Sequence, residues 1–174
     1  MRPARLPSAL FLLSLTAWCS ACAQLTGNVT IINQLDQPMA GRIGKEAFHC
    51  EPKRSWSSQH VKPGEQELAI TGQPAMKVTV AEGKSTIVEP SGTACFIVAD
   101  YRRQYGERST GEVQIVERFE QQKTFAPKQP LTVAYGERLP TEVPEGTPVR
   151  RLQLVDCPAL HNDEQLAETL KRLP

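Results

Sequence analysis

The sequence predicts a mainly β protein, an antiparallel β-sandwich of about 8–9 short strands with one C-terminal α-helix. Its 14 prolines and 11 glycines are spread along the chain and divide it into short apolar or alternating runs. Only the C-terminal end has the spacing and capping residues of a helix. The expected strands cover residues 28–33, 39–45, 67–71, 75–80, 85–89, 94–101, 112–119, 131–135 and 149–155.

The first strands are short and differ in character. Residues 28–33 (NVTIIN) are β-branched and are followed by turn-forming residues. Residues 39–45 contain two glycines, which favours an edge or a bulge. Residues 75–80 alternate, so one face of this strand meets water. Because Glu82 and Gly83 form a turn before the next strand, we expect residues 75–89 to form a hairpin.

The later elements include the best candidate for a central strand. Residues 94–101 (ACFIVADY) form a continuous apolar run, which is expected when both faces of a strand are covered. Residues 112–119 alternate less cleanly and indicate a half-buried strand. Residues 48–61 have no regular pattern and predict a surface loop. Residues 136–148 contain three prolines four apart, which favours a second long loop before the last strand.

The helix is expected over residues 162–173. Asn162 is a good N-cap with Gln165 three positions later, and acidic residues occupy the first turn where the helix dipole favours them. Leu166, Leu170 and Leu173 form an apolar stripe. A helix of about twelve residues is marginal alone, so we expect the stripe to pack against the sheet.

The first residues have the layout of a secretory signal peptide. Arg2 and Arg5 provide a positive region, residues 9–18 are apolar, and small residues follow in positions 19–23. The apolar run is too short to span a bilayer. We therefore expect a signal peptide over residues 1–21, or alternatively 1–23, followed by a single domain over residues 22–174 of about 150 residues.

Two cleavage sites overlap within this leader. Ala21-Cys22-Ala23 fits the small-residue pattern of a signal peptidase that cuts before Gln24. The run Cys19-Ser20-Ala21-Cys22 resembles a bacterial lipobox, with Cys19 where that motif usually has Leu. The resemblance implies that Cys22 becomes the lipid-modified first residue and anchors the protein to a membrane surface. In bacteria with two membranes, Ala23 at the next position implies the outer membrane.

The charge of the exported part argues against nucleic acid as a partner. Removal of Arg2 and Arg5 leaves 18 of the 20 basic residues against 19 acidic residues, a formal charge of −1. Nucleic-acid-binding domains are usually basic, with lysine and arginine clustered on one face. No such cluster larger than a pair occurs in the sequence.

Three cysteines remain in the expected folded part, at positions 50, 95 and 157. An exported protein can form one disulfide among them and leave one thiol over. Cys50 and Cys157 each stand just ahead of a proline at the end of an expected strand, and Cys95 opens the most apolar strand. The pairing stays open, although we expect Cys50 to be one of the bonded cysteines.

A cluster of aromatic and arginine side chains follows the central strand. Arginine offers paired donors to carboxylates, and tyrosine offers a surface for stacking. These residues predict a candidate patch for a sugar or a peptidoglycan carboxylate, against the simpler alternative of a solvated loop. The patch consists of Tyr101, Arg102, Arg103 and Tyr105.

No common catalytic motif occurs after the leader, and no cofactor is expected. The sequence therefore favours an exported protein of the bacterial envelope, anchored by lipid at the outer membrane or free in the periplasm or outside the cell. Its expected role is structural or binding, with a membrane surface, an envelope protein or a glycan as partner. The alternative is a periplasmic hydrolase or metal-dependent enzyme that uses His49, His60 and Asp100.

Overall fold

The computed structural model describes residues 27–106 and 110–171. Within them the chain is mainly β, with several antiparallel sheets and one C-terminal α-helix, as predicted. The helical elements are the 3₁₀ turns η1 (Arg102–Gln104) and η2 (Cys157–Ala159) and the helix α1 (Asp163–Lys171). The strands are β1 (Gly27–Ile32), β2 (Met39–Ile43), β3 (Glu46–Cys50), β4 (Ser55–Val61), β5 (Gly64–Ile70), β6 (Met76–Val80), β7 (Ser85–Val88), β8 (Cys95–Asp100), β9 (Gln114–Phe119), β10 (Thr124–Phe125) and β11 (Arg150–Val155).

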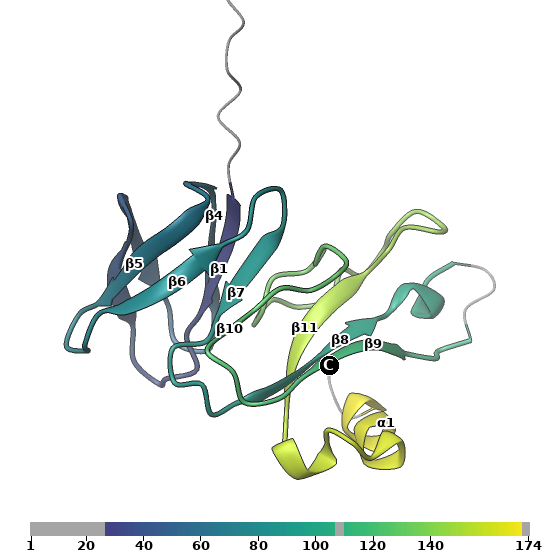
Figure 1. Cartoon of the computed structure of the whole chain (residues 1–174). Coiled ribbons are helices and arrows are strands. Elements are labelled where there is room, and N and C mark those ends of the chain that lie inside the picture. Colours follow the sequence, from purple (N-terminus) through teal and green to yellow (C-terminus); the bar gives the residue numbers. More distant parts are fainter. Residues whose placement is uncertain (1–26, 107–109, 172–174) are drawn as a thin grey trace, which may run out of the picture.

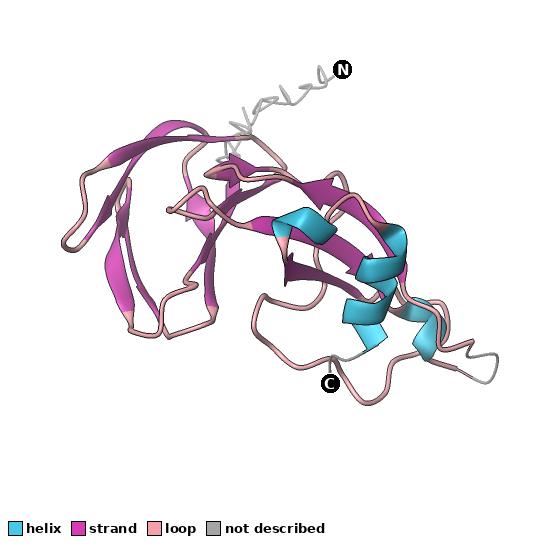
Figure 2. Cartoon of the chain, turned by 90° about the horizontal axis from the view of Figure 1, so that it is seen from below, coloured by secondary structure: helices cyan, strands magenta, loops and turns pink. Residues whose placement is uncertain are grey.

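The strands form three sheets. The outer sheet has the order β3-β2-β5-β6, the middle sheet β10-β7-β1-β4, and the C-terminal sheet β11-β8-β9. Figure 1 shows β5 and β6 on one side, β1 and β7 in the centre, and β8, β9 and β11 on the other side. The helices lie beside the C-terminal sheet, away from the outer sheet (Figure 2). The C-terminal helix is present as predicted, and the strands form three sheets where a sandwich has two.

The middle sheet takes part in two hydrophobic cores, because successive residues of a strand point to opposite faces. Val29 and Ile31 of β1 belong to the core shared with the outer sheet. Ile32 of β1 and Ile87 of β7 belong to the core shared with the C-terminal sheet. Val29 and Ile31 are fully buried on one face of β1, so a shift of the register by one residue would put the polar Asn28 and Thr30 into that core.

β8 is buried along its whole length, which confirms the prediction of a central strand. Its side chains alternate between two cores. Phe96 and Val98 lie in the core shared with the middle sheet, whereas Ile97 and Ala99 lie in the core that contains Leu166 of α1. The continuous apolar sequence of this strand follows from having a packed layer on each side.

The C-terminal helix begins where its capping residue predicts. Oδ1 of Asn162 accepts a hydrogen bond from the backbone N–H of Gln165 at 3.1 Å, which satisfies one of the free donors at the helix start. Leu166 and Leu170 are buried against the C-terminal sheet, as the apolar stripe predicts. No helix in the described residues is both long and apolar enough to cross a membrane.

The predicted hairpin of residues 75–89 is wrong. β6 pairs with β5 in the outer sheet, whereas β7 pairs with β1 in the middle sheet, and the β1–β7 pair is parallel. The turn between them carries the chain from one sheet to the other, with Gly83 at a φ of 64°. Turn residues specify a reversal of direction, and the partner of each strand is decided by which core its side chains enter.

Two further segments differ from the prediction. Residues 48–61, expected to be a surface loop, contain most of β3 and all of β4, with Phe48 and Cys50 buried. Residues 131–135, expected to be a strand, form only a single parallel bridge between Val133 and Arg151. Segment 48–61 has few β-branched residues, and burial of alternate side chains against the neighbouring sheets overrides this weak local preference.

Candidate functional site

A pocket of about 320 Å³ lies at the carboxyl ends of β1 and β7. These two strands run parallel as neighbours, so the segments that follow them leave the middle sheet at the same edge. The rest of the wall comes from the start of β2 and from the loops that precede β6 and β8. The lining residues are Ile32, Asn33, Gln34, Leu35, Met39, Gln73, Glu89, Pro90, Ser91 and Thr93. We call this cavity the Glu89 pocket.

Glu89 is a buried acidic residue in the pocket wall, only 2% exposed. Its Oε1 accepts a hydrogen bond from the backbone N–H of Ser91 at 3.0 Å, and its Oε2 accepts one from the backbone N–H of Gly92 at 2.8 Å. The Ser91 hydroxyl also donates to Oε2 at 2.8 Å. Both carboxylate oxygens therefore accept hydrogen bonds from the turn that follows β7. No ion pair involves Glu89 among the described residues.

Asn33 holds the loop that forms one side of the pocket, and it is 1% exposed. Its Nδ2 donates to the backbone carbonyls of Gln37 at 2.9 Å and of Cys50 and Glu51 at 3.1 Å each. Its Oδ1 accepts the backbone N–H of Leu35 at 2.9 Å. One amide thus fixes the turn after β1 to the end of β3.

Two other residues of this loop, Gln34 and Leu35, also line the pocket. The side-chain nitrogen of Gln34 is buried and has no hydrogen-bond partner among the described residues. Oδ1 of Asn28 and Nε of Arg150 and Arg151 are buried without a hydrogen-bond partner in the same way. Leu35 is 43% exposed. Among the described residues, only Leu35 and Leu154 are large hydrophobic residues with exposed side chains.

Of the predicted patch of Tyr101, Arg102, Arg103 and Tyr105, the structure buries Tyr101 and leaves the other three residues at least partly exposed. Tyr101 is 2% exposed, and its hydroxyl donates to Oε1 of Gln153 at 2.6 Å. Burial raises the pKa of this tyrosine. The Tyr105 hydroxyl donates to the carbonyl of Pro140 at 2.7 Å. Tyr101 directly follows β8 and lies in the core that contains Leu166, whereas Tyr105 is half-buried.

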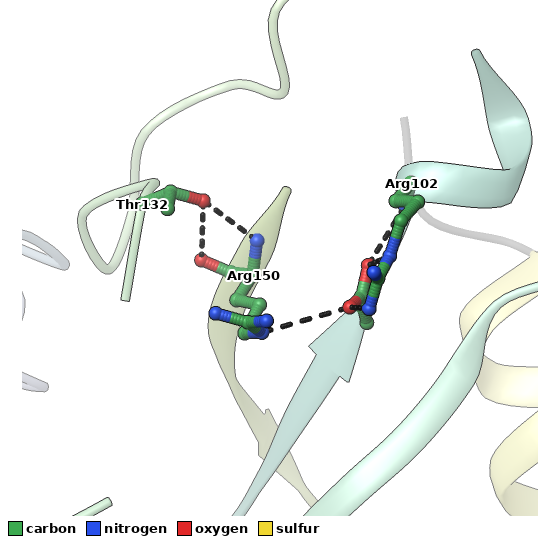
Figure 3. A network of polar contacts seen from close by, with 4 residues as sticks. Arg102, Thr132 and Arg150 are labelled. Carbon is green, nitrogen blue, oxygen red and sulfur yellow. Dashed lines mark hydrogen bonds and ion pairs between the residues drawn. The ribbon is translucent and has the colours of Figure 1, made fainter. Parts of the chain in front are cut away.

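The two arginines of this patch are paired with acids. Arg103 bonds Glu112 at 2.6 Å. Arg102 bonds Oδ2 of Asp100 at 2.5 Å, and Arg150 approaches the same oxygen at 3.6 Å. Figure 3 shows this network, in which Thr132 also bonds the backbone of Arg150. The small pocket here is lined by these charges, so the arginines already have carboxylate partners within the chain.

The Asp100 network predicts a pH-dependent contribution to stability. Burial by itself would raise the pKa of Asp100, but hydrogen bonds and charge from Arg102, with the charge of Arg150, lower it below its ordinary value. The unfolded chain, with an aspartate pKa of about 3.9, therefore takes up the proton first as the pH falls. Asp100 contributes stability above about pH 4 that is lost on further acidification.

We expect Asp100→Asn to be less stable than wild type at pH 7 and to lose less stability between about pH 4 and pH 2. Urea unfolding at several pH values measures both effects. Asp36, whose side chain is 94% exposed, provides the matched control, and Asp36→Asn should leave stability at pH 7 unchanged. An Asp100→Asn variant as stable as wild type at pH 7 would contradict this role.

The structure does not bring together His49, His60 and Asp100. They lie on β3, β4 and β8, which belong to three different sheets. His49 is exposed and bonds Glu51 at 3.1 Å, while Asp100 is held by arginines. No group of three histidine, cysteine or acidic residues in the described ranges is placed to hold a metal ion. The proposed metal site formed by these residues is therefore wrong.

The disulfide joins Cys95 and Cys157, and Cys50 is a free thiol. The expectation that Cys50 is bonded is wrong, because this residue lies in the core between the outer and middle sheets and is 1% exposed. Burial raises the pKa of the Cys50 thiol. Cys95 of β8 instead pairs with Val155 of β11. Because Val155 stands two residues before Cys157, this pairing brings Cys157 close to Cys95. The predicted lipidation site, Cys22, lies outside the described residues.

The Glu89 pocket is not among the sites that the sequence predicts. The available signal was a charged residue that ends an apolar strand, directly before the turn sequence Pro90-Ser91-Gly92. The loop after β1 reaches the pocket because β1 and β7 pair in parallel. No local sequence pattern predicts this pairing. Comparisons with family models, curated proteins and solved structures find no match for this chain.

Proposed function

We propose that this chain is an exported protein of the bacterial envelope, held at the outer membrane by a lipid on Cys22, with a binding or structural role. The observation that carries the proposal is the leader, in which a positive start, a short apolar run and the Cys19–Cys22 motif follow one another. The proposed partners are the membrane surface, through the anchor, and an envelope component, through the folded part.

The disulfide supports the exported location. Cys95 and Cys157 are joined across a separation of 62 residues. Such bonds form and persist in oxidising compartments such as the bacterial periplasm, and reducing systems keep most cytosolic thiols free. A stable bond between these two residues fits a protein that folds after export.

The Glu89 pocket supports a binding role. Its volume of about 320 Å³ is within the range of small-ligand sites, and its wall combines apolar side chains with a few fixed polar groups. The hydrogen bonds around Glu89 and Asn33 hold this wall in place without a ligand. A preorganised wall lowers the entropic cost of binding.

The start of β1 and the Glu89 pocket lie at opposite ends of one strand. β1 begins at Gly27, five positions after Cys22, and runs for six residues toward the pocket. A strand of this length spans about 20 Å. In the proposed arrangement, the pocket therefore lies at the end of β1 that is farther from Cys22 along the chain.

Membrane fractionation of Cys22→Ser tests the proposal. We expect the wild-type protein in the outer-membrane fraction and the variant in the soluble periplasmic fraction, because Ala21 and Ala23 remain on either side of the small serine and still allow cleavage by signal peptidase. Cys19→Ser is the matched control and should stay with the membrane, since Cys19 is removed in either case. A wild-type protein that is soluble, with Gln24 at its N-terminus, would contradict the anchor.

A further inference from the structure

We propose that a second cavity, between the middle sheet and the segment 130–137, binds one ring of a neutral sugar. We call this cavity, which has a volume of about 300 Å³, the Ser57 pocket. The inference deepens the proposed function, because it rests on the proposed binding role and names a ligand class for it. It does not depend on the lipid anchor. Three features of the pocket carry it: a polar floor, accessible groups on both sides, and a fixed wall.

The floor of the Ser57 pocket is the polar part of one face of the middle sheet. Ile32 of β1 packs on this face into the core shared with the C-terminal sheet. Side chains two and four residues earlier in the strand lie on the same face, because strand side chains alternate. There the sheet carries hydroxyl and amide groups that line the cavity. They belong to Asn28 and Thr30 of β1, Ser57 of β4 and Ser85 of β7.

The floor groups can both donate and accept hydrogen bonds. The hydroxyl oxygens of Thr30 and Ser57 lie 2.9 Å apart and bond each other. Nδ2 of Asn28 donates to the hydroxyl oxygen of Ser85 at 3.3 Å. Each hydroxyl offers one donor and two acceptor positions, so these pairs leave further positions for a ligand. The hydroxyls of a sugar have the same dual character and therefore match this floor.

A ligand can reach these groups, since the residues on both sides of the cavity are open to solvent. On the floor, Ser57 is exposed, and Thr30 and Ser85 are half-buried. On the opposite side, Pro130 and Glu137 are exposed. The volume is at the small end of the range for ligand sites, which suits a single ring.

The charges around the cavity favour a neutral ligand. The four floor groups are neutral, and no lysine or arginine of the described residues lines the cavity, whereas the carboxylate residue Glu137 does. A phosphate or carboxylate ligand would find no counter-charge here and would be repelled by Glu137. Hydroxyl groups, in contrast, can donate charge-assisted hydrogen bonds to this carboxylate. Pro130 and Leu131 add apolar surface for the C–H groups of a sugar ring.

The wall formed by segment 130–137 is held from two sides. Toward the C-terminal sheet, the backbone N–H of Thr132 donates to the carbonyl of Arg150 at 2.9 Å, and the Thr132 hydroxyl also bonds the backbone of Arg150 (Figure 3). Toward the middle sheet, the hydroxyl of Ser55 donates to the carbonyl of Tyr135 at 3.2 Å. A wall that is fixed before the ligand arrives lowers the entropic cost of binding.

A nuclear magnetic resonance titration of the purified protein tests the inference. The probes are the methyl glycosides of glucose, galactose and N-acetylglucosamine. The control for each probe is its uronic acid, in which a carboxylate replaces the hydroxymethyl group. We expect at least one neutral probe to shift the backbone amides of Ser57, Ser85 and Thr132 saturably, and to bind about threefold more tightly than its uronic acid at low salt. The Gln165 amide at the helix cap should not move.

Variants separate the contributions of the floor and of the carboxylate. Thr30→Val keeps the β-branched shape, removes the hydroxyl, and should weaken binding of the neutral probe about fivefold. Ser57→Ala, at an exposed position that tolerates the change, should act in the same direction. Thr79→Val, at an exposed position of β6 in the outer sheet, is the matched control and should change nothing. Glu137→Gln should remove the preference for the neutral probe over its uronic acid.

Several results would overturn the inference. They are the absence of saturable shifts at Ser57 and Ser85 with all three neutral probes, equal or tighter binding of the uronic acids to the wild-type protein, and unchanged affinity in both Thr30→Val and Ser57→Ala. None of these results bears on the anchor, because fractionation of Cys22→Ser tests the tether separately.

Discussion

Reduction of the Cys95–Cys157 disulfide is expected to lower the free energy of unfolding by about 4 kcal/mol. The bond closes a long loop, with 62 residues of separation, and opening such a loop increases the conformational entropy of the unfolded chain. The measurement is urea unfolding with and without a thiol reductant. The midpoint should fall markedly on reduction.

The position of the bond adds a local consequence. Cys157 lies between β11 and α1, and α1 has nine residues in the described part of the chain, which is too short for independent stability. Without the bond, we expect α1 to lose its contact with the C-terminal sheet first. The control is the double variant Cys95→Ala/Cys157→Ala, on which the reductant should have no effect. An unchanged midpoint of the wild-type protein after complete reduction would contradict this account.

Asn33→Asp is expected to destabilise the protein by about 3 kcal/mol, although the two side chains have nearly the same shape. The change replaces a donor nitrogen by an oxygen that faces the carbonyls of Gln37, Cys50 and Glu51. Because Asn33 is 1% exposed, water cannot compensate for the lost hydrogen bonds. Thermal and urea unfolding measure the loss.

The same chemical change at the helix cap is the matched control. Asn162 acts through its oxygen, which accepts the Gln165 N–H, and aspartate has an oxygen in the same place. We therefore expect Asn162→Asp to change stability by no more than about 0.5 kcal/mol, since both residues are good N-caps. Equal effects of the two variants would show that the Asn33 hydrogen bonds do not hold the loop.

The sequence predicts those elements whose signals are local. Asn162 and the leucine stripe predict the helix α1, and the continuous apolar run predicts the buried strand β8. Both elements are present. The pairing of β6 and β7 is not local. The same turn allows a hairpin or a crossing between two sheets, and only the packing of Ile87 and Val88 into different cores selects the crossing.

The candidate site was less predictable than the fold. Tyr101 is a residue type that is common in recognition sites, but it directly follows β8 and its side chain lies in the core. Cys50 resembles a disulfide partner by its place before a proline, yet its side chain enters a core that contains no second cysteine. Glu89 becomes a site residue only when the parallel β1–β7 pair brings Gln34 to the same edge.

The most direct test of the account is the mass of the N-terminal peptide of the protein purified from the cells that naturally produce it. We predict a chain that begins at Cys22, lacks residues 1–21, and carries a diacylglyceryl thioether on its first residue. A chain that retains Met1 or Arg2, recovered from the cytosol, would contradict both the export and the anchor.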